Sequence, residues 1–321
     1  MANSRDNQAQ NDNQAQNGVC RIGTRGSDLA LWQAHTIKGM LKDLAVETEL
    51  NIIKTRGDKI DNVPFSKLEG KNFFTKELED AQLDGRVDMA VHSLKDLATD
   101  MVPGLTLCAM VGREDPRELL LARPEAVDQA KVEAGDVIPL KDGAKIGTSA
   151  ARRQGQVRVI RPDMEIADLR GNVPTRINRL REGLYDGILL ARAGVMRLEL
   201  DVSDLYTKPL EIGDFVPAPA QGMLGIQCRD GDKWQDVLAQ MNCGEQGTAV
   251  AAERHLLNQL EGGCHLPFGV NINGAGSVWK LEAFLGDDDI TREPLRFTLD
   301  GTDPDALGAE AWERIVAYKK G

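Results

Sequence analysis

Two short segments of this chain recur later in the same order, and this repetition is the feature that most constrains the fold. RIGTR at 21–25 is matched by KIGTS at 145–149, and each opens a helix after an apolar strand. DGRVD at 84–88 is matched by EGLYD at 182–186, and each leads into another apolar strand. Either match alone could arise by chance, but their common order predicts two similar α/β lobes with parallel strands. We expect these doubly wound lobes to form a cleft, with binding residues at the strands' carboxyl ends.

The C-terminal part of the chain follows a different pattern. A helix is expected over 248–260, then alternating antiparallel strands over 270–273, 278–285 and 290–299, and a last helix over 303–320. This predicts a small α+β domain. The full division is a disordered Asn- and Gln-rich tail (1–18), domain 1 (19–114 and 218–240), domain 2 (115–217) and domain 3 (241–321), with hinges near 113–117 and 215–219.

Composition excludes several classes of partner. The net charge of −11 disfavours nucleic acid. No apolar run approaches the roughly 18 residues of a membrane span. The five cysteines are odd in number and lack C-x-x-C spacing, and the four histidines are scattered. We therefore expect reduced thiols, a cytoplasmic location and no metal site.

Arginines gather in the second predicted lobe. Ten arginines and no lysine lie between Arg152 and Arg197. Arginine presents a planar fork that grips carboxylate or phosphate with two hydrogen bonds. Arg179 and Arg181 fit a solvated helix face, whereas the Arg152-Arg153 pair and Arg170 follow loops that reach the expected cleft. The cluster indicates a site for a ligand with several carboxylates or phosphates, and the alternative is an ordinary charged surface.

Two further stretches carry reactive side chains. In DMAVHSLKDL (88–97) an apolar strand ends in Ser93, Lys95 and Asp96. Asp96 has no second acid beside it, so we expect it to stay ionised and accept hydrogen bonds; the alternative is a surface Lys–Asp pair. Cys264 follows two glycines in a loop, and the adjacent His265 is poorly placed as its base. This favours a thiol that carries a group, although a free cysteine is more often a small buried apolar residue.

Together these motifs closely resemble those of the porphobilinogen deaminase (hydroxymethylbilane synthase) family. The resemblance covers about residues 20–270 and is carried by RIGTRGSDLALWQA (21–34), TRGD (55–58), VHSLKDL (91–97), REDPRE (113–118), IGTSAARR (146–153), LRGNVPTR (169–176), QGMLGIQCR (221–229) and LEGGCHLPFG (260–269). Ala150-Ala151 departs from the Ser-Leu that is commoner before the arginine pair, which puts one polar cofactor contact in doubt.

The resemblance implies a transferase of haem and porphyrin biosynthesis. It would join four porphobilinogens head to tail into hydroxymethylbilane with release of ammonia, on a dipyrromethane primer held by a thioether to Cys264. The implied fold is two lobes of the periplasmic-binding-protein type plus the third domain. We expect a monomer with no nucleic-acid, membrane or metal partner.

The same resemblance assigns roles to individual residues. Asp96 and Lys95 are the implied catalytic pair. The implied cofactor contacts, besides these two and Cys264, are Ser93, Thr148, Ser149, Arg152, Arg153, Arg170 and Gly171. The implied substrate contacts are Arg25, Ser27, Arg176, Arg197 and Gln221, and Lys71 and Phe74 belong to a lid loop.

The chemistry gives these residue types a reason. Loss of ammonia from an aminomethyl pyrrole leaves positive charge on the ring nitrogen, which an ionised carboxylate stabilises as it develops. Each pyrrole brings two carboxylates, so the growing chain is a polyanion that arginines can hold. The alternatives are a two-lobed polycarboxylate-binding protein without catalysis and a non-catalytic member of the same family.

Overall fold

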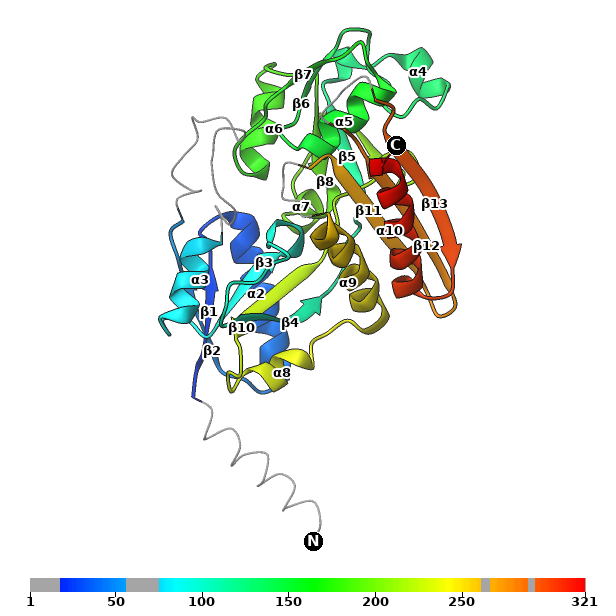
Figure 1. Ribbon diagram of the computed structural model, residues 1–321. Helices are drawn as coiled ribbons and strands as arrows, with labels where there is room; N and C mark the ends of the chain where they lie inside the picture. The colour runs from blue at the N-terminus through cyan, green and yellow to red at the C-terminus, as the bar shows by residue number, and fades with distance from the viewer. Residues whose placement is uncertain (1–17, 56–74, 261–265, 288–291, 321) are drawn as a thin grey trace. The chain divides into compact units, whose positions relative to one another are not determined.

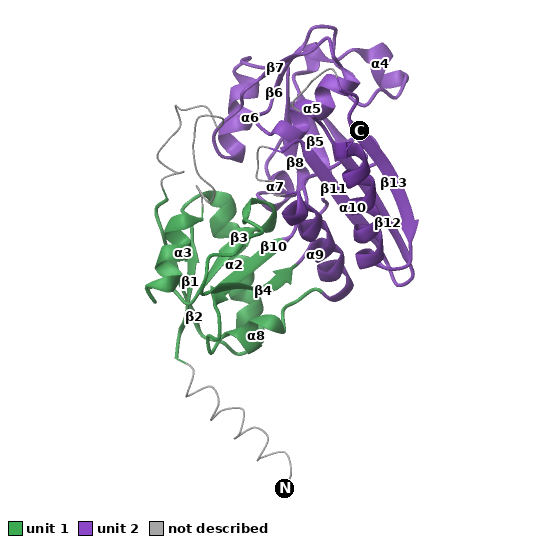
Figure 2. Ribbon diagram, in the orientation of Figure 1, with its two compact units in different colours: residues 1–59, 72–111, 224–243 green, residues 60–71, 112–223, 244–321 purple. Residues whose placement is uncertain are grey.

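The chain is described by a computed structural model that covers residues 18–55, 75–260, 266–287 and 292–320 (Figure 1). These residues belong to two compact units (Figure 2). Unit 1 is drawn from residues 1–59, 72–111 and 224–243, and unit 2 from residues 60–71, 112–223 and 244–321. The chain therefore leaves unit 1 after Val111 and returns to it at Leu224. The finer division into three domains and a cleft stays a prediction.

Unit 1 is built on a five-stranded sheet with the order β2-β1-β3-β10-β4. Its strands are β1 (Cys20–Thr24), β2 (Thr48–Ile52), β3 (Met89–Ser93), β4 (Leu105–Val111) and β10 (Leu224–Arg229). Strand β1 pairs in parallel with β2 and β3, whereas β10 is antiparallel to β3 and β4. The helices are α2 (Asp28–Asp43), α3 (Lys76–Leu83) and α8 (Gln235–Ala239), and the 3-10 turn η3 (Leu94–Asp96) follows β3. Ile37 and Leu41 of α2 pack on Met89 and Val91 in the core of this unit.

The first sheet of unit 2 repeats this topology. Its order is β7-β6-β8-β5-β9, with β6 parallel to β7 and β8 and with β5 antiparallel to β8 and β9. The strands are β5 (Glu118–Ala122), β6 (Lys145–Gly147), β7 (Glu165–Ala167), β8 (Gly187–Ala191) and β9 (Tyr206–Leu210). The helices are α4 (Gln129–Glu133), α5 (Ala151–Ile160), α6 (Val173–Arg181) and α7 (Arg192–Arg197), with a 3-10 turn η4 (Pro124–Ala126). The prediction of two similar α/β sheets is confirmed.

The repeated aspartate has a structural role in both sheets. The Asp88 carboxylate accepts a hydrogen bond from the Arg21 backbone N–H at 2.9 Å, and the Asp186 carboxylate accepts one from the Lys145 N–H at 2.8 Å. The backbone N–H of each aspartate donates in return to the carbonyl of the same partner, both at 2.8 Å. Each aspartate thus joins the starts of two neighbouring parallel strands.

An arginine completes each of these junctions. Arg229, at the end of β10, pairs with Asp88 at 3.1 Å, and Arg123, just after β5, pairs with Asp186 at 2.6 Å. Burial raises the pKa of the Asp88 carboxyl, but its hydrogen bonds from Arg21 and Arg229 outweigh burial and leave the pKa below its ordinary value. The sequence repeat therefore marks matched ion-paired junctions that fix strand register.

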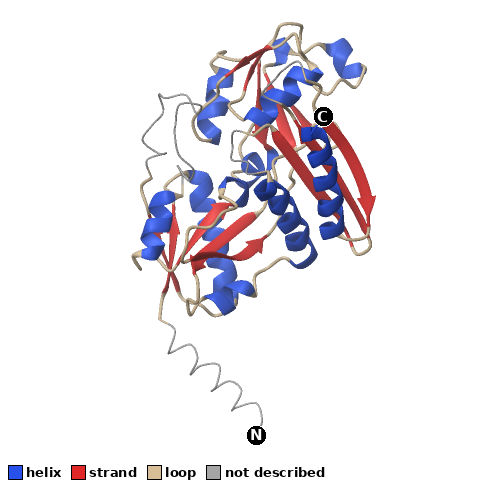
Figure 3. Cartoon of the chain, in the orientation of Figure 1, coloured by secondary structure: helices blue, strands red, loops and turns tan. Residues whose placement is uncertain are grey.

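The C-terminal part of unit 2 forms a separate antiparallel sheet, β11-β12-β13. Its strands are β11 (Phe268–Ala275), β12 (Val278–Leu285) and β13 (Leu295–Gly301), with helices α9 (Gly244–Gln259) and α10 (Pro304–Lys320) beside them (Figure 3). Leu256, Val270, Leu281 and Ile315 share one core across these helices and strands. The predicted α+β organisation of this part is confirmed.

One expectation from composition is wrong. Cys108 of β4 and Cys228 of β10 form a disulfide, with their Cα atoms 6.4 Å apart, so not all of the cysteines are reduced thiols. The two positions are 120 residues apart in sequence, and only the antiparallel pairing of β4 with β10 brings them together. Among the described cysteines, Cys20 and Cys243 form no disulfide. No helix in the described ranges is long and apolar enough to cross a membrane.

Candidate active site

The predicted residues of unit 1 lie at one edge of its sheet. Arg25 follows β1, and Ser27 is the N-cap of α2, where its hydroxyl accepts a hydrogen bond from a first-turn N–H. Ser93 ends β3, and Lys95 and Asp96 lie in η3 immediately after it. Because β1 and β3 are parallel neighbours, their carboxyl ends meet at the same edge. The structure therefore brings these five residues to one end of the sheet.

Asp96 is held outward by two buried leucines. Leu94 and Leu97, on either side of the Lys95-Asp96 pair, are both buried, and the Leu97 N–H donates to the Leu94 carbonyl at 3.3 Å. Lys95 is half-buried and Asp96 is exposed. The turn thus anchors its apolar side chains in the core and leaves the Asp96 carboxylate accessible to a ligand. An ordinary surface Lys–Asp pair could occupy the same turn, so the catalytic role of Lys95 and Asp96 stays a prediction at this point.

Ser93 has a partner that the sequence reasoning missed. The buried Gln33 side chain of α2 donates a hydrogen bond from Nε2 to Ser93 Oγ at 2.7 Å. This bond ties the helix to the end of β3. Gln33 shares the buried face of α2 with Ile37 and Leu41. Because Gln33 stands where the helix pattern calls for an apolar residue, the sequence could have indicated a buried polar contact there.

Another group of predicted residues meets at the carboxyl ends of β6 and β7 in unit 2. The hydroxyl of Ser149 donates to the Leu169 carbonyl and accepts from its N–H, both at 3.0 Å. The Arg176 Nε donates to the Gly171 carbonyl at 2.7 Å. Gly171 has φ of +101°, a backbone conformation that suits glycine. The Ser149 bonds join the loop after β6, which holds Thr148, to the loop after β7, which holds Arg170, and the Arg176 bond ties the latter loop to α6.

The predicted arginine pair lies in the interior of unit 2. Arg152 and Arg153 both contact the carboxylate of Glu118, and the Arg153 Nη2 is 2.7 Å from Glu118 Oε2. The arginine side chains are each 6% exposed and Glu118 is fully buried. Burial lowers the pKa of Arg152, and the charge of Glu118 opposes that shift. Glu118 was not predicted, although an acid opening the apolar strand ELLLA could have indicated it.

Arg197 and Gln221 contact the two segments that connect the units along the chain. Arg197 Nη2 donates to the Gly222 carbonyl at 2.6 Å, and burial lowers the pKa of this guanidinium. Gln221 Nε2 donates to the Pro116 carbonyl at 2.8 Å and to Glu118 Oε1 at 3.1 Å. Both side chains therefore support the connecting segments, and their role as substrate contacts stays a prediction.

Three predicted residues, Lys71, Phe74 and Cys264, lie outside the described residues. Within the ranges that are described, no group of three or more His, Cys, Asp or Glu side chains could hold a metal ion.

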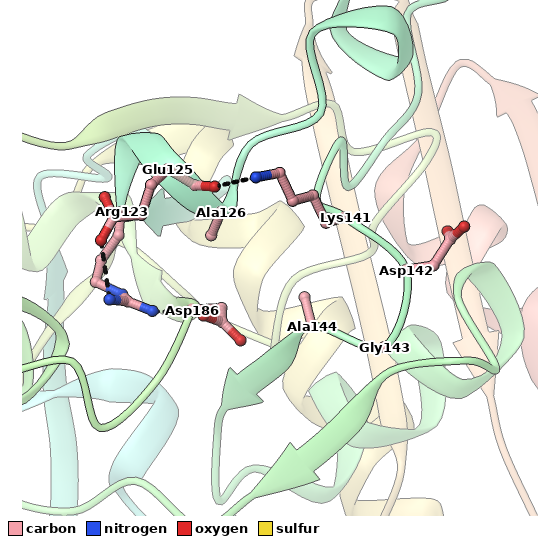
Figure 4. A pocket seen from close by; sticks show the side chains of 8 residues that line it. All are labelled: Arg123, Glu125, Ala126, Lys141, Asp142, Gly143, Ala144 and Asp186. Atoms are coloured by element: carbon pink, nitrogen blue, oxygen red, sulfur yellow. Dashed lines mark hydrogen bonds and ion pairs between the residues drawn. The ribbon is translucent and has the colours of Figure 1, made fainter.

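A small pocket of about 200 Å³ in unit 2 contains none of the predicted residues (Figure 4). It lies at the amino ends of β6 and β8, the opposite edge of that sheet. Its cations are already engaged, because Arg123 pairs with Glu125 and Asp186 and Lys141 donates to the Glu125 carbonyl. The pocket is therefore a poor candidate for the site.

Comparison with protein families gives a consistent result over most of the chain. The family model described as "Porphobilinogen deaminase, dipyromethane cofactor binding domain" matches residues 20–236, and the "Porphobilinogen deaminase, C-terminal domain" matches residues 248–317. A porphobilinogen deaminase of Trichlorobacter lovleyi is 41% identical over 302 residues, covering 92% of this chain and 93% of the relative. One of Helicobacter hepaticus is 42% identical over 267 residues, covering 83% and 80%.

Solved structures that resemble the chain are more distant. A periplasmic VFT2 domain of Bordetella pertussis BvgS has a TM-score of 0.43 at 11% identity, covering 77% of this chain and 96% of that one. A periplasmic substrate-binding protein of an ABC transporter from Coxiella burnetii has a TM-score of 0.43 at 13% identity, covering 74% and 97%.

Proposed function

The chain belongs to the porphobilinogen deaminase family, and from that premise we propose how its own residues carry out the reaction. The reaction is the head-to-tail joining of four porphobilinogens into hydroxymethylbilane with release of ammonia, in tetrapyrrole synthesis. It demands two things of a protein. Positive charge that develops on a pyrrole nitrogen must be stabilised, and a chain that gains carboxylates at every step must be held.

Asp96 meets the first demand, and its outward position between Leu94 and Leu97 is the observation that carries the proposal. Its carboxylate accepts hydrogen bonds from the substrate's pyrrole N–H and stabilises the charge that develops as ammonia leaves. The same carboxylate accepts the proton that is lost when the ring becomes aromatic again. Lys95 lies beside it in the turn and pairs with a substrate carboxylate.

The remaining edge residues meet the second demand. Arg25 holds a substrate carboxylate near the amino end of α2, where Ser27 caps the helix and the helix dipole favours an anion. In unit 2, Arg176, Arg197 and Gln221 are the proposed substrate contacts. The lid residues Lys71 and Phe74 complete this set.

The residues of unit 2 also fit dipyrromethane, the cofactor of this family. Arg152 and Arg153 bring two positive charges to the single carboxylate of Glu118, which leaves one positive charge in excess. Arg153 Nε is buried with no hydrogen-bond acceptor among the described residues. A ligand carboxylate would supply both the charge and the acceptor.

The other proposed cofactor contacts are Ser93, Lys95, Asp96, Thr148, Ser149, Arg170 and Gly171, and Cys264 is the proposed point of attachment. When bound, the dipyrromethane supplies the primer to which the first substrate is joined.

The attachment is tested by the mass of the intact protein. We expect a mass above that of the sequence by one dipyrromethane, with peptide mapping placing the adduct on Cys264. Cys264→Ser should abolish the adduct, and Cys243→Ser, which changes a half-buried cysteine outside the disulfide, should keep it. Active protein with unmodified Cys264 would overturn the attachment. A stable protein that binds polycarboxylates without an adduct or turnover would favour the non-catalytic alternative.

The role of Asp96 is tested by Asp96→Asn. This change keeps the shape of the side chain but removes its charge, so we expect the fold and the adduct to persist while turnover nearly disappears. Asp100→Asn is the matched control, because it neutralises another exposed acid of the same region. Substantial turnover by Asp96→Asn would show that the carboxylate charge does not drive the reaction.

We further propose that the protein is a cytoplasmic monomer with the three domains given above. Its place among biosynthetic enzymes supports the location. Disulfides rarely persist in a reducing compartment, so the Cys108–Cys228 bond has to resist reduction there or be opened without loss of the fold.

A further inference from the structure

The two repeated sheets differ at the positions beneath the Asp96 turn. Aligning Asp88 with Asp186 matches β3 with β8, and the strand registers then match β10 with β5. At three matched buried positions unit 2 has only leucines, whereas unit 1 has other residue types: Leu190 corresponds to His92, Leu119 to Gly225 and Leu121 to Gln227. At these three positions the same strand pairing thus forms with leucines in unit 2 and with a histidine, a glycine and a glutamine in unit 1.

The polar residues of unit 1 form a buried network. His92 Nε2 lies 3.1 Å from Gln227 Oε1, which also accepts a hydrogen bond from Gln82 Nε2 at 2.9 Å. Glu79 lies on α3, the helix that also carries Gln82. Burial raises the pKa of the Glu79 carboxyl, and a hydrogen bond with Gln227 opposes that shift. Burying polar groups costs free energy even when they are paired. Leucines occupy the three matching positions in unit 2, so this strand pairing does not itself require polar residues at those positions.

Gly225 packs directly against Leu94, the first residue of the turn that carries Asp96. A Cβ added at Gly225 would lie 2.7 Å from Leu94 Cδ1 and 3.2 Å from Leu107 Cδ1. Leu94 is fully buried and is the first residue of η3, two positions before Asp96. Gly225 is also the register partner of His92. A side chain at position 225 would therefore require Leu94 to shift, and we expect that shift to reach the turn because Leu94 is its first residue.

We propose that Gly225, together with the His92–Gln227 bond, positions the Asp96 carboxylate. The glycine sets how deeply Leu94 enters the core, and the bond fixes the end of β3 from which the turn departs. These are positioning residues, because they act on the reaction through Asp96. The inference rests on the proposed function of Asp96. A misplacement of about 1 Å can slow an enzymatic reaction by about 100-fold.

The first test is Gly225→Ala, with Gly301→Ala as its matched control. A Cβ at Gly301 would lie 2.9 Å from Leu307 Cδ2, so the control also presses a methyl group against a leucine, but in the C-terminal sheet. We expect both variants to lose stability to a similar extent. Only Gly225→Ala should lower kcat, by about 10- to 100-fold, with little change in KM.

A second experiment relieves the clash between the new Cβ at position 225 and the Leu94 side chain. Leu94→Val in the Gly225→Ala background removes the Cδ1 methyl group that the new Cβ meets but keeps an apolar side chain in the core, and we expect kcat to recover at least several-fold over Gly225→Ala alone. No recovery, or an equal loss of kcat in Gly301→Ala, would overturn the positioning role. The double variant His92→Leu/Gln227→Leu introduces the leucines that unit 2 has at the matching positions. We expect this variant to fold and to have a lower kcat. Wild-type kcat in this variant would show that the His92–Gln227 bond does not help to position Asp96.

A readout without turnover separates this inference from the proposed function. Hydrogen exchange of the Leu97 amide, which bonds to the Leu94 carbonyl, should quicken in Gly225→Ala and stay unchanged in Gly301→Ala. An unchanged exchange rate in Gly225→Ala would show that the contact between Gly225 and Leu94 does not fix the turn, and this conclusion does not depend on which reaction the protein catalyses. Wild-type protein that forms no product, or an active Asp96→Asn variant, would instead overturn the proposed function and leave the exchange result standing.

Discussion

Replacing Glu118 by Gln would test whether one carboxylate neutralises the buried arginine pair. Each carboxylate oxygen of Glu118 contacts a different guanidinium, from Arg152 and from Arg153, and none of these side chains is more than 6% exposed. Glutamine has nearly the same shape but turns one of those oxygens into an NH₂ group. That group would face a guanidinium N–H, so donor would meet donor where a charge pair existed. Two cations would remain buried without an anion.

The expected magnitude follows from this loss. Removing one partner of a buried ion pair typically costs about 3–5 kcal/mol, because the remaining charge stays desolvated. For a folding unit of roughly 150–250 residues, each kcal/mol lowers the melting temperature by about 2–4 °C. Multiplying the lower limits and the upper limits gives an expected decrease of roughly 6–20 °C.

The assay is urea and thermal unfolding, followed by circular dichroism, in protein with and without the cofactor. Cys264→Ser provides the cofactor-free background. Glu310→Gln is the control: its ion pair with Arg314 is about half exposed, so the change should cost well under 1 kcal/mol. If cofactor carboxylates approach the arginines, Glu118→Gln should lower the free energy of unfolding by less in protein that carries the cofactor than in protein without it. A loss below about 1 kcal/mol in the cofactor-free protein would refute the reasoning.

Three further changes test other parts of the structure. The backbone hydrogen bond from the start of β6 and the ion pair with Arg123 lower the pKa of Asp186. Its stabilisation is therefore complete above the unfolded pKa of about 3.9 and is lost as pH falls through the lower folded value. Asp186→Asn should flatten the dependence of unfolding free energy on pH below about pH 4. Reducing the Cys108–Cys228 bond should lower the unfolding free energy by up to about 5 kcal/mol, because the bond closes a loop of 120 residues; the loss should vanish in Cys108→Ser. Gly222→Ala should destabilise the protein by about 3 kcal/mol or more in urea unfolding, because φ is +88° and a Cβ would lie 2.2 Å from a backbone carbonyl oxygen.

The paired sheets explain how one architecture can hold two kinds of edge. Both use an aspartate at the same strand junction, and both place functional candidates at the carboxyl ends of parallel strands. After β3 the chain turns tightly through η3 and presents an exposed acid, whereas after β8 it enters α7, where Arg192 pairs with Asp115 and Arg197 is buried. In the proposed function, the first edge does chemistry and the second holds anions.

The sequence by itself determined the local features of the protein. Alternating apolar residues predicted the C-terminal strands and helices, and the two repeats predicted two similar α/β lobes, whereas β4, β5, β7, β9 and β10 were not predicted. The segment at 21–25 was expected to open a helix, and α2 follows it with Ser27 as its cap. The family and its reaction were also readable, because the motifs around Asp96 and Cys264 are contiguous stretches whose residue types reflect the chemistry they perform.

Only the tertiary structure decided which distant residues are partners. Glu118 meets Arg152 across 34 residues, and His92 meets Gln227 across 135. The disulfide joins strands 120 residues apart and contradicts what cysteine spacing indicated. These pairings depend on strand order and register, which cores of similar apolar residues leave open in the sequence. The space beside Gly225 is likewise set by Leu94 from another strand end, so a glycine's role there became visible only when the sheet had been assembled.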